Sequence, residues 1–190
     1  METLKEYFIS QGFSGEEALH IAGEFIYKQY KKGDLFVEEG KISRHLGFIE
    51  NGFLQYFIVI DGEEKTTYSI GSNNFVASLI SFLKQVPSRE NIRAITDTSI
   101  WRIDRDAFRK IQATIPSFNF FYIGLLEWQI CCIEESRLDA ICLSAQQRYE
   151  KVLHKEPALI QQIPLQYIAS ILGVTPRHLS RIRNNVAKMR

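Results

Sequence analysis

Residues 164–187 read PLQYIASILGVTPRHLSRIRNNVA, and this stretch decides the fold of the C-terminal part of the chain. Apolar residues at helical spacing over 165–172 predict a short helix. Gly173 ends it, because glycine readily takes the left-handed conformation that follows many helices. The Thr-Pro pair at 175–176 starts another helix, since threonine is a good N-cap and proline a good first residue. Two short helices joined by a glycine-containing turn are the helix-turn-helix pattern.

The second predicted helix, which runs to about residue 186, has an apolar and a polar face. Leu179 and Ile182 are spaced to pack on the first helix, where the small Ala169 allows a close approach. Guanidinium groups on the polar face suit guanine edges, and hydroxyl and amide groups suit phosphates. Any surface helix has a polar face, so only the combination of spacing, turn and cap favours DNA binding. The polar face contains Arg177, His178, Ser180, Arg181 and Asn184.

Charge is distributed unevenly, although the net charge of the chain is only +1. No acidic residue follows Glu156, so residues 157–190 carry five basic residues and a charge of +5. The rest of the chain has 18 basic and 22 acidic residues, a charge of −4. A basic C-terminal unit on an acidic body favours an anionic partner such as double-stranded DNA. The five basic residues are Arg177, Arg181, Arg183, Lys188 and Arg190.

The N-terminal part of the chain has the pattern of an all-β unit preceded by one or two short amphipathic helices within residues 4–30. Short β-branched and aromatic runs follow, with a turn signal about every ten residues. Asp61-Gly62 predicts a hairpin between strands 53–60 and 63–70, because both residues tolerate a positive φ. Many short strands favour an antiparallel jelly roll or small barrel of two packed sheets, with 100–103 as the last strand.

Three helices are predicted between this β-roll and the helix-turn-helix. Asp104 is a suitable N-cap for a helix over 105–113, and Ser144 starts a capping box for a helix to about residue 155. Between them, residues 117–142 form a longer helix with an apolar stripe. An identical helix in a partner chain or the helix's own β-roll can cover this stripe, and we favour dimerisation. The stripe consists of Phe118, Phe121, Leu125, Trp128 and Cys132.

No pattern in the chain indicates catalysis, a metal or another cofactor. The histidines lack a compact ligand spacing, and no nucleophile motif or phosphate-binding glycine loop is present. We interpret the three cysteines, Cys131, Cys132 and Cys142, as free thiols that are buried small residues rather than sensors. No run approaches the ~18 apolar residues of a membrane span, and the charged start is unlike a signal peptide. We therefore expect a cytoplasmic protein that is not an enzyme.

The expected architecture is an α+β chain in three parts. Residues 1–115 form an N-terminal antiparallel, jelly-roll-like β-roll with flanking helices, which serves as a sensor domain. Residues 116–143 form a long dimerisation helix. Residues 144–190 form the helix-turn-helix domain.

At this point the chain resembles the Crp/Fnr family of transcription regulators, in its short Bacteroidetes-like form. KKGDLF at 31–36, with EG at 39–40 and FIENG at 48–52, looks like the opening of a cyclic-nucleotide-binding β-roll. IASILGVTP at 168–176, with LSRIR at 179–183, looks like the family's helix-turn-helix. The resemblance spans nearly the whole chain. It implies a homodimer that binds DNA and in which an effector in the β-roll reorients the DNA-binding helices.

The resemblance also implies roles for individual residues of the helix-turn-helix. By position, Gln166 and Thr175 would contact phosphate. Arg177, His178 and Arg181 would face base edges, and the matching motif adds Ser180 and Arg183 to the DNA-binding set. The sequence ends at Arg190, which leaves little room for the β-hairpin wing that often follows the recognition helix.

The effector pocket departs from the family pattern. Ala77 and Ser78 stand where a Gly-Glu pair would hold a ribose hydroxyl, and the later Arg-Ser pair falls near Ser88-Arg89, in rearranged form. We therefore predict that the protein does not bind cyclic AMP in the usual way. Arg89 and Arg93 are candidates to hold another anion, or are ordinary surface arginines, so the small-molecule effector is unidentified.

The sequence is also compatible with two other functions. One is a β-roll sensor module that signals through a protein–protein interface formed by the C-terminal helices. The other is an enzyme built on a small barrel. Salt dependence separates the first from DNA binding, because only DNA binding weakens steeply as ionic strength rises.

Overall fold

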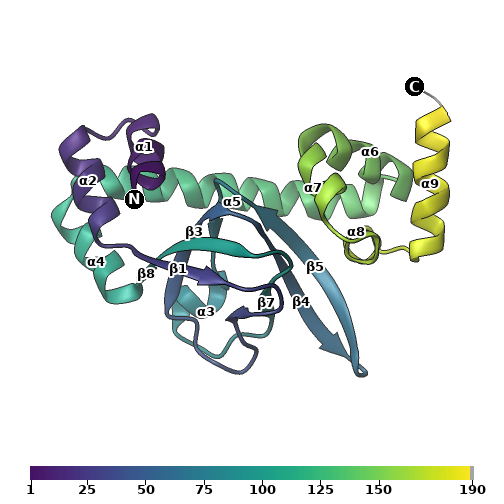
Figure 1. Ribbon diagram of the computed structural model, residues 1–190, viewed down its shortest axis with the longest axis horizontal. Coiled ribbons are helices and arrows are strands. Elements are labelled where there is room, and N and C mark those ends of the chain that lie inside the picture. Colours follow the sequence, from purple (N-terminus) through teal and green to yellow (C-terminus); the bar gives the residue numbers. More distant parts are fainter. Residues whose placement is uncertain (189–190) are drawn as a thin grey trace. The chain divides into compact units, whose positions relative to one another are not determined.

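The computed structural model describes residues 1–188, so Arg190 of the basic set lies outside the described residues. The chain divides into two compact units. The first, called the β-roll unit, comprises Met1–Tyr56 and Ile70–Leu126. The second, called the C-terminal unit, comprises Phe57–Ser69 and the chain from Glu127 onward. The expected α+β class with a β-roll, a long helix and C-terminal helices is confirmed (Figure 1).

Two short helices and a set of strands open the chain, as the sequence predicts, and two more helices accompany the β-roll. The capping box of α2 is formed between Ser14 and Glu17, and the Asp104 carboxylate caps α4 by accepting from Asp106 and Ala107. The helices are α1 (Glu2–Ser10), α2 (Gly15–Gly23), α3 (Leu79–Lys84) and α4 (Arg105–Thr114), and the strands are β1 (Ile26–Tyr30), β2 (Leu35–Val37), β3 (His45–Asn51), β4 (Phe53–Ile60), β5 (Glu63–Gly71), β6 (Phe75–Val76), β7 (Asn91–Ala94) and β8 (Thr98–Asp104).

The strands form two four-stranded sheets, in the orders β1-β8-β3-β6 and β2-β7-β4-β5. The pairs of the first sheet are antiparallel, with Phe48 opposite both Trp101 of β8 and Phe75 of β6. Buried aliphatic side chains from both sheets, such as Ile49 of β3 and Leu54 of β4, share one core cluster. The predicted pair of packed antiparallel sheets is therefore present.

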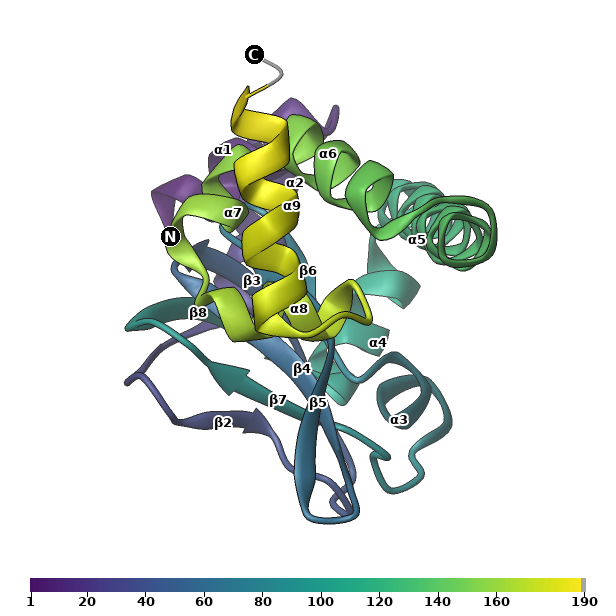
Figure 2. The same cartoon turned by 90° about the vertical axis from the view of Figure 1, so that its right-hand side faces the viewer.

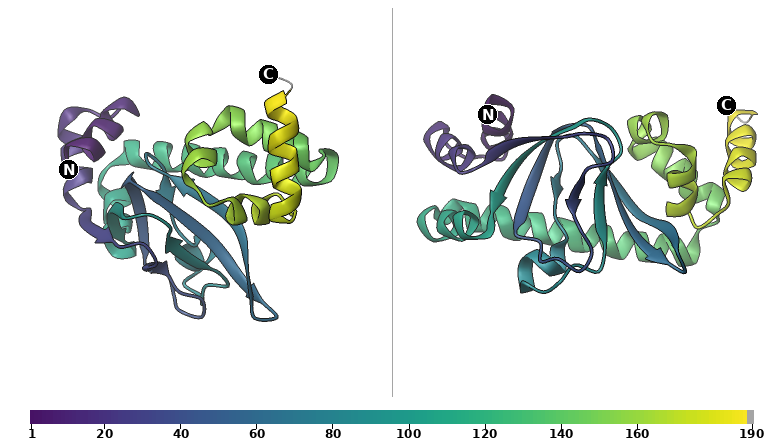
Figure 3. Two further views of the ribbon diagram at one scale, coloured as in Figure 1. Left: turned by 45° about the vertical axis from the view of Figure 1, so that its right-hand side comes forward. Right: turned by 60° about the horizontal axis from the view of Figure 1, so that its bottom comes forward.

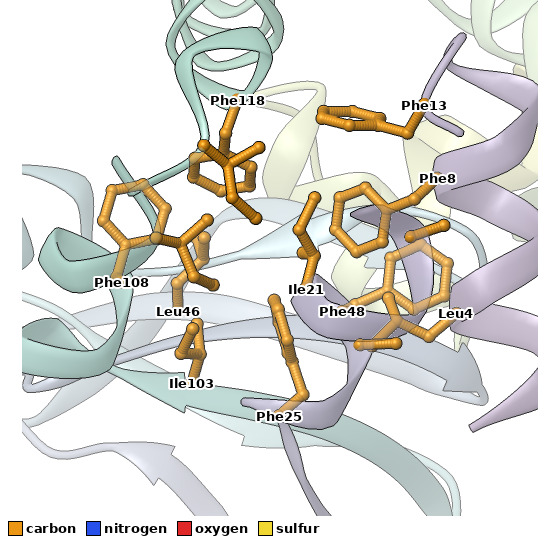
Figure 4. Close-up of a cluster of buried hydrophobic side chains, with 14 of the residues drawn as sticks. Leu4, Phe8, Phe13, Ile21, Phe25, Leu46, Phe48, Ile103, Phe108 and Phe118 are labelled. Carbon is orange, nitrogen blue, oxygen red and sulfur yellow. The ribbon is translucent and has the colours of Figure 1, made fainter. Parts of the chain in front are cut away.

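Aromatic side chains fill a second core between the first sheet and the flanking helices (Figure 4). The ring of Phe118 lies 5.4 Å from that of Phe108 and 6.4 Å from that of Phe8, measured between centroids. Phe118 lies in the first turn of the long helix α5 (Pro116–Cys142) and is only 2% exposed. Phe121 packs against the same cluster. The start of α5 is thus held by the β-roll unit itself.

This packing corrects the interpretation of the apolar stripe on α5. The side chains of Phe118 and Phe121 are covered by the chain's own β-roll, which was the less favoured alternative, whereas Trp128 is half-exposed. The interpretation of the cysteines as buried was also wrong, since Cys131 and Cys142 are exposed and Cys132 is intermediate, although all three are free thiols. Both corrections follow from the packing of α5. Only its start contacts the β-roll core, and Phe118 is its one buried residue, so the cysteines farther along the helix remain accessible in a single chain.

The C-terminal unit contains a compact set of helices (Figure 2). Ser144 and Gln147 form the predicted capping box at the start of α6. Proline is the first residue of α7, and Pro164 is the N-cap residue of α8. Buried side chains from all four helices, including Tyr149, Ile160 and Leu179, form the interior. The helices are α6 (Ala145–Lys155), α7 (Pro157–Gln162), α8 (Leu165–Ile171) and α9 (Pro176–Lys188).

The long hairpin of β4 and β5 supplies residues 57–69 to the C-terminal unit (Figure 3). Its turn is the predicted one, with φ of 53° at Asp61 and 79° at Gly62. The backbone N–H of Thr66 donates to Oγ of Ser170 at 2.8 Å, and the Ser170 hydroxyl is 3.3 Å from the Thr66 carbonyl oxygen that accepts from it. One side chain of α8 therefore binds both backbone polar groups of one hairpin residue.

Candidate functional site

The turn between α8 and α9 has the geometry that its sequence predicts. Gly173 adopts a φ of 65°, and the N–H of Val174 donates to the carbonyl of Ala169 at 2.9 Å. Oγ1 of Thr175 accepts from the N–H of His178 at 3.2 Å, which confirms the threonine cap. These bonds satisfy backbone groups that the helix ends would otherwise leave unpaired, and they fix where α9 begins.

The apolar side of α9 is buried against its neighbours. Leu179 is 0% exposed, and Ile182 and Val186 are also buried, at three- and four-residue spacing along the helix. Ala169 of α8 is buried as well, and α8 and α9 are in extensive contact. Leu179 and Ile182 are buried on the side of α9 that packs against other helices, and α9 contacts both α8 and α6. The packing therefore determines which side of α9 remains exposed.

Only some of the DNA-binding residues predicted from the sequence lie together on the exposed face of α9. Arg177 and Arg181 are exposed and four residues apart, so they lie on one face about one turn apart. Lys188 and Asn184 continue this face and are exposed too; Lys188 was counted only in the charge balance. Arg183 is exposed but lies on another side of the helix, because two residues correspond to about 200° of rotation.

The other predicted contacts lie around this face. His178 is exposed next to Arg177, and Thr175 is exposed at the N-terminal end of α9. Gln166 is exposed in the first turn of α8. Ser180 is half-buried, and its hydroxyl donates to the carbonyl of Pro176 at 3.0 Å, so it is already engaged within its own helix.

Helix α5 presents a second candidate surface, which the sequence pattern did not single out. Six of its exposed apolar or thiol side chains share one face, and two pairs of them are seven residues apart, since Ile130 follows Ile123 and Leu138 follows Cys131. Phe120 is 79% exposed and Ile141 is 71% exposed, which is unusual for side chains of this size. The face, called the α5 outer face, consists of Phe120, Ile123, Ile130, Cys131, Leu138 and Ile141.

The predicted effector residues fall into separate groups. Ser78 and Ser88 are both buried, and their hydroxyl oxygens are 3.0 Å apart. The Ser78 hydroxyl also donates to Oε1 of Glu90 at 3.1 Å. Burial raises the pKa of Glu90, more than this hydrogen bond lowers it. Glu90 was missed at the sequence level, although it directly follows the Ser88-Arg89 pair.

The remaining pocket residues have other neighbours. Nη2 of Arg93 donates to Oε1 of the buried Gln55 at 2.9 Å, while Arg89 is exposed. The carbonyl of Ala77 accepts from the hydroxyl of Tyr56 at 3.4 Å. A cavity of about 260 Å³ lies elsewhere in the β-roll unit, along residues 35–38 and 41–45, and is lined by none of these residues.

In the part of the chain that the structure describes, residues 1–188, no group of three or more His, Cys, Asp or Glu side chains is placed to hold a metal ion. Likewise, none of its helices combines the length and apolar character needed to span a bilayer.

Comparison with known proteins agrees with this geometry. Residues 27–114 match the family of the cyclic nucleotide-binding domain. FixK2 from Bradyrhizobium japonicum has a TM-score of 0.73 at 17% identity, covering 87% of this chain and 85% of that chain. A protein from Eubacterium rectale, described as a transcriptional regulator of the Crp/Fnr family, has a TM-score of 0.68 at 18% identity, covering 97% and 88%. The c-di-GMP-responsive global regulator CLP from Xanthomonas campestris has a TM-score of 0.69 at 14% identity, covering 92% of each chain.

The chain therefore has the fold of a Crp/Fnr-type regulator, as the resemblance implied. Within that fold, residues 27–114 are a cyclic nucleotide-binding-like β-roll.

Proposed function

We propose that this protein is a transcription regulator that binds double-stranded DNA as a homodimer and does not respond to cyclic AMP. The observation that carries the proposal is the division of α9 between a buried apolar side at Leu179 and Ile182 and an exposed side with Arg177 and Arg181. A helix held in this way by its partner helix can enter the major groove while its arginines reach base edges. The regulator fold supports this proposal.

The DNA contacts divide into two kinds. Arg177 and Arg181, with His178 beside them, are proposed to read base edges. Gln166 and Thr175 are proposed to hold phosphates, which set the register of the helix on the duplex but carry no sequence information. Ser180 and Arg183 stay in the predicted set with a smaller expected contribution, because Ser180 already bonds within α9 and Arg183 lies off the main face.

A second copy of this chain is the proposed occupant of the α5 outer face. Ile123 and Ile130 are seven residues apart, as are Cys131 and Leu138, and this is the spacing of helices that wrap around each other. Pairing two identical helices would bury these apolar side chains and place two copies of α9 around a two-fold axis. Half-sites about one helical turn apart would then match the protein.

The proposed lack of response to cyclic AMP rests on the β-roll. The buried hydroxyls of Ser78 and Ser88 both donate to Glu90, Ser78 to its carboxylate and Ser88 to its backbone carbonyl. An ionised carboxylate here would repel a cyclic phosphate. CLP, which shares the fold, is c-di-GMP-responsive, so a fold of this kind does not restrict the ligand to cyclic AMP. Any effector of this protein is therefore proposed to be another small molecule.

We propose that the protein is not an enzyme and acts in the cytoplasm. The division into a sensor domain at 1–115, a dimerisation helix at 116–143 and a DNA-binding domain at 144–190 stays a prediction about function. It describes roles along the chain, whereas the two compact units describe contacts.

The experiment that tests this function is a salt series on DNA from the protein's own promoter region. Binding through several phosphate contacts should weaken with a slope in log K against log salt of about −0.9 for each neutralised phosphate. The other candidate function, signalling through an apolar protein interface, predicts no specific DNA complex. A weak complex that is the same on unrelated DNA would therefore contradict the proposal.

A further inference from the structure

Arg148 of α6 joins two helices of the C-terminal unit through their carbonyl ends. Its Nη1 donates to the carbonyl of Ala140 at 3.1 Å, and its Nη2 donates to the carbonyl of Leu172 at 2.8 Å. Ala140 lies in the last turn of α5, and Leu172 is the C-cap residue of α8. One side chain therefore links the end of the long helix to the residue directly before the Gly173 turn.

The chemistry of this contact suits arginine and no other residue. The last carbonyls of a helix lack partners within the helix and carry the negative end of its dipole. A guanidinium group offers two nitrogens at fixed separation and stays charged at all physiological pH values. Lysine is also charged, but it has a single flexible ammonium group. Hydrogen bonds from a charged donor are about twice as strong as neutral ones.

Helix α6, which carries Arg148, is itself held against α5 by ion pairs. Lys151 forms an ion pair with Asp139 of α5 at 2.5 Å, and Lys155 forms one with Glu135 at 2.9 Å. The capping box at Ser144 starts α6 two residues after the end of α5, and Figure 2 shows the ribbon passing from α5 into α6. The guanidinium group of Arg148 therefore fixes the position of Leu172 relative to α5. The turn that starts α9 directly follows Leu172, so it is held in place as well.

We propose that Arg148 is a positioning residue that sets the placement of α9 relative to α5, and thereby the spacing between the two recognition helices of the homodimer. This inference rests on the proposed function. If two copies of α5 pair, each α9 is held at a distance from the two-fold axis that depends on Arg148. The residue would then determine which half-site spacing the dimer accepts, without touching DNA.

The expected effect is selective. Binding to one half-site uses the surface of a single copy of α8 and α9, so its affinity should change less than twofold when Arg148 is replaced. Binding to both half-sites needs two correctly placed helices, and a loosened link lowers the effective concentration of the second helix. Loss of a charge-assisted hydrogen bond corresponds to about a tenfold or greater effect. The Arg148 variants should therefore bind a site with two half-sites about tenfold or more weakly than wild type does. Changing the spacing of the half-sites should also lower their affinity less than it lowers that of wild type.

The test compares wild type with Arg148→Lys and Arg148→Met, and with Lys155→Met as a control that removes another α6–α5 contact but leaves Leu172 alone. The first probe is a DNA duplex with two symmetric half-sites, which the wild-type protein selects from random DNA. The other probes are the isolated half-site and variants of the full duplex with one base pair added or removed between the half-sites. Mobility shift gives the affinities and their salt slopes, and thermal unfolding reports the stability of each variant.

The inference is supported if both Arg148 variants lose affinity for the two-fold duplex and discriminate less between spacings, with half-site affinity and salt slope unchanged. Equal behaviour of the variants and wild type overturns it. A salt slope smaller by about one would make Arg148 a phosphate contact instead. Half-site affinity and unfolding temperature falling together would mean a purely structural role. If wild type itself selects no DNA, the proposed function fails first.

Discussion

The hydroxyl oxygens of Ser78 and Ser88 lie 3.0 Å apart in the interior of the β-roll unit. These serines stand where the resemblance places the carboxylate and the guanidinium group that would hold a cyclic nucleotide. The Ser78 hydroxyl donates to Oε1 of Glu90 at 3.1 Å, and the Ser88 hydroxyl donates to the backbone carbonyl of Glu90 at 2.7 Å, so both hydroxyls are satisfied without a ligand.

The first prediction follows for ligand binding. Cyclic AMP and cyclic GMP should give no heat of binding in a calorimetric titration at micromolar protein, because the ribose hydroxyl lacks a charged acceptor and the phosphate would meet Glu90. Replacing Ser88 by arginine should not suffice to create binding while Glu90 remains. Micromolar affinity of the wild-type protein for either nucleotide would show that another set of groups holds the phosphate.

The second prediction concerns the pH dependence of stability at Glu90. Burial raises the pKa of this carboxyl, so the folded state disfavours its ionised form. The destabilising effect is absent below the ordinary carboxyl pKa and grows as the pH rises through the raised value. Glu90→Gln keeps an acceptor for Ser78 and should therefore increase the free energy of unfolding at pH 7 relative to wild type, with less gain at pH 4.

Chemical denaturation at the two pH values measures this difference. Glu6→Gln, at an exposed site on α1, is the matched control and should show little change. A gain for Glu90→Gln that is equal at both pH values would mean that the charge of Glu90 is not its cause.

The third prediction concerns the α5 outer face. Ile130→Asp should raise the dissociation constant of the dimer at least about a hundredfold, because each interface would bury two unpaired carboxylates. Ser136→Asp introduces the same charge on the far side of α5, where the residue is exposed, and should leave the dimer intact. Sedimentation equilibrium gives both constants, and a wild-type protein that is monomeric at tens of micromolar would rule out this face as a dimer interface.

The fourth prediction concerns the link between the hairpin and α8. Ser170→Ala should lower the free energy of unfolding by about 1–2 kcal/mol, because the buried Thr66 loses partners for its N–H and carbonyl groups. Ser180→Ala removes a hydroxyl that bonds only to Pro176 of its own helix and should cost about 0.5 kcal/mol or less. Equal costs for the two variants in urea denaturation would show that the hairpin contact adds nothing.

Local signals were sufficient for much of the fold. The Asp61-Gly62 turn, the Ser144 capping box and the Gly173 turn each depend on a few neighbouring residues, so the sequence alone predicted them and the structure confirms them. The helix-turn-helix and the β-roll were predicted from local patterns in the same way, and the resemblance to the Crp/Fnr family rests on motifs that are contiguous in the chain.

Features that depend on long-range packing were not predictable in this way. Helix α5 has large apolar side chains on more than one face, and periodicity cannot tell that Phe118 is buried in the β-roll while Phe120 is exposed. The burial of the cysteines was misjudged for this reason. The contacts of Arg148 and Ser170 join residues far apart in sequence, and no local pattern indicates them.

The central claim is that α9 reads DNA through Arg177 and Arg181. The most direct measurement is a mobility shift on the protein's own promoter region, comparing wild type with Arg177→Ala plus Arg181→Ala. Lys32→Ala plus Lys84→Ala, at two exposed sites of the β-roll unit, removes the same charge as a control. We predict a discrete complex for wild type and the control, and a loss of at least about tenfold in affinity for the arginine variant. Equal binding by all three proteins, or binding by none, would contradict the claim.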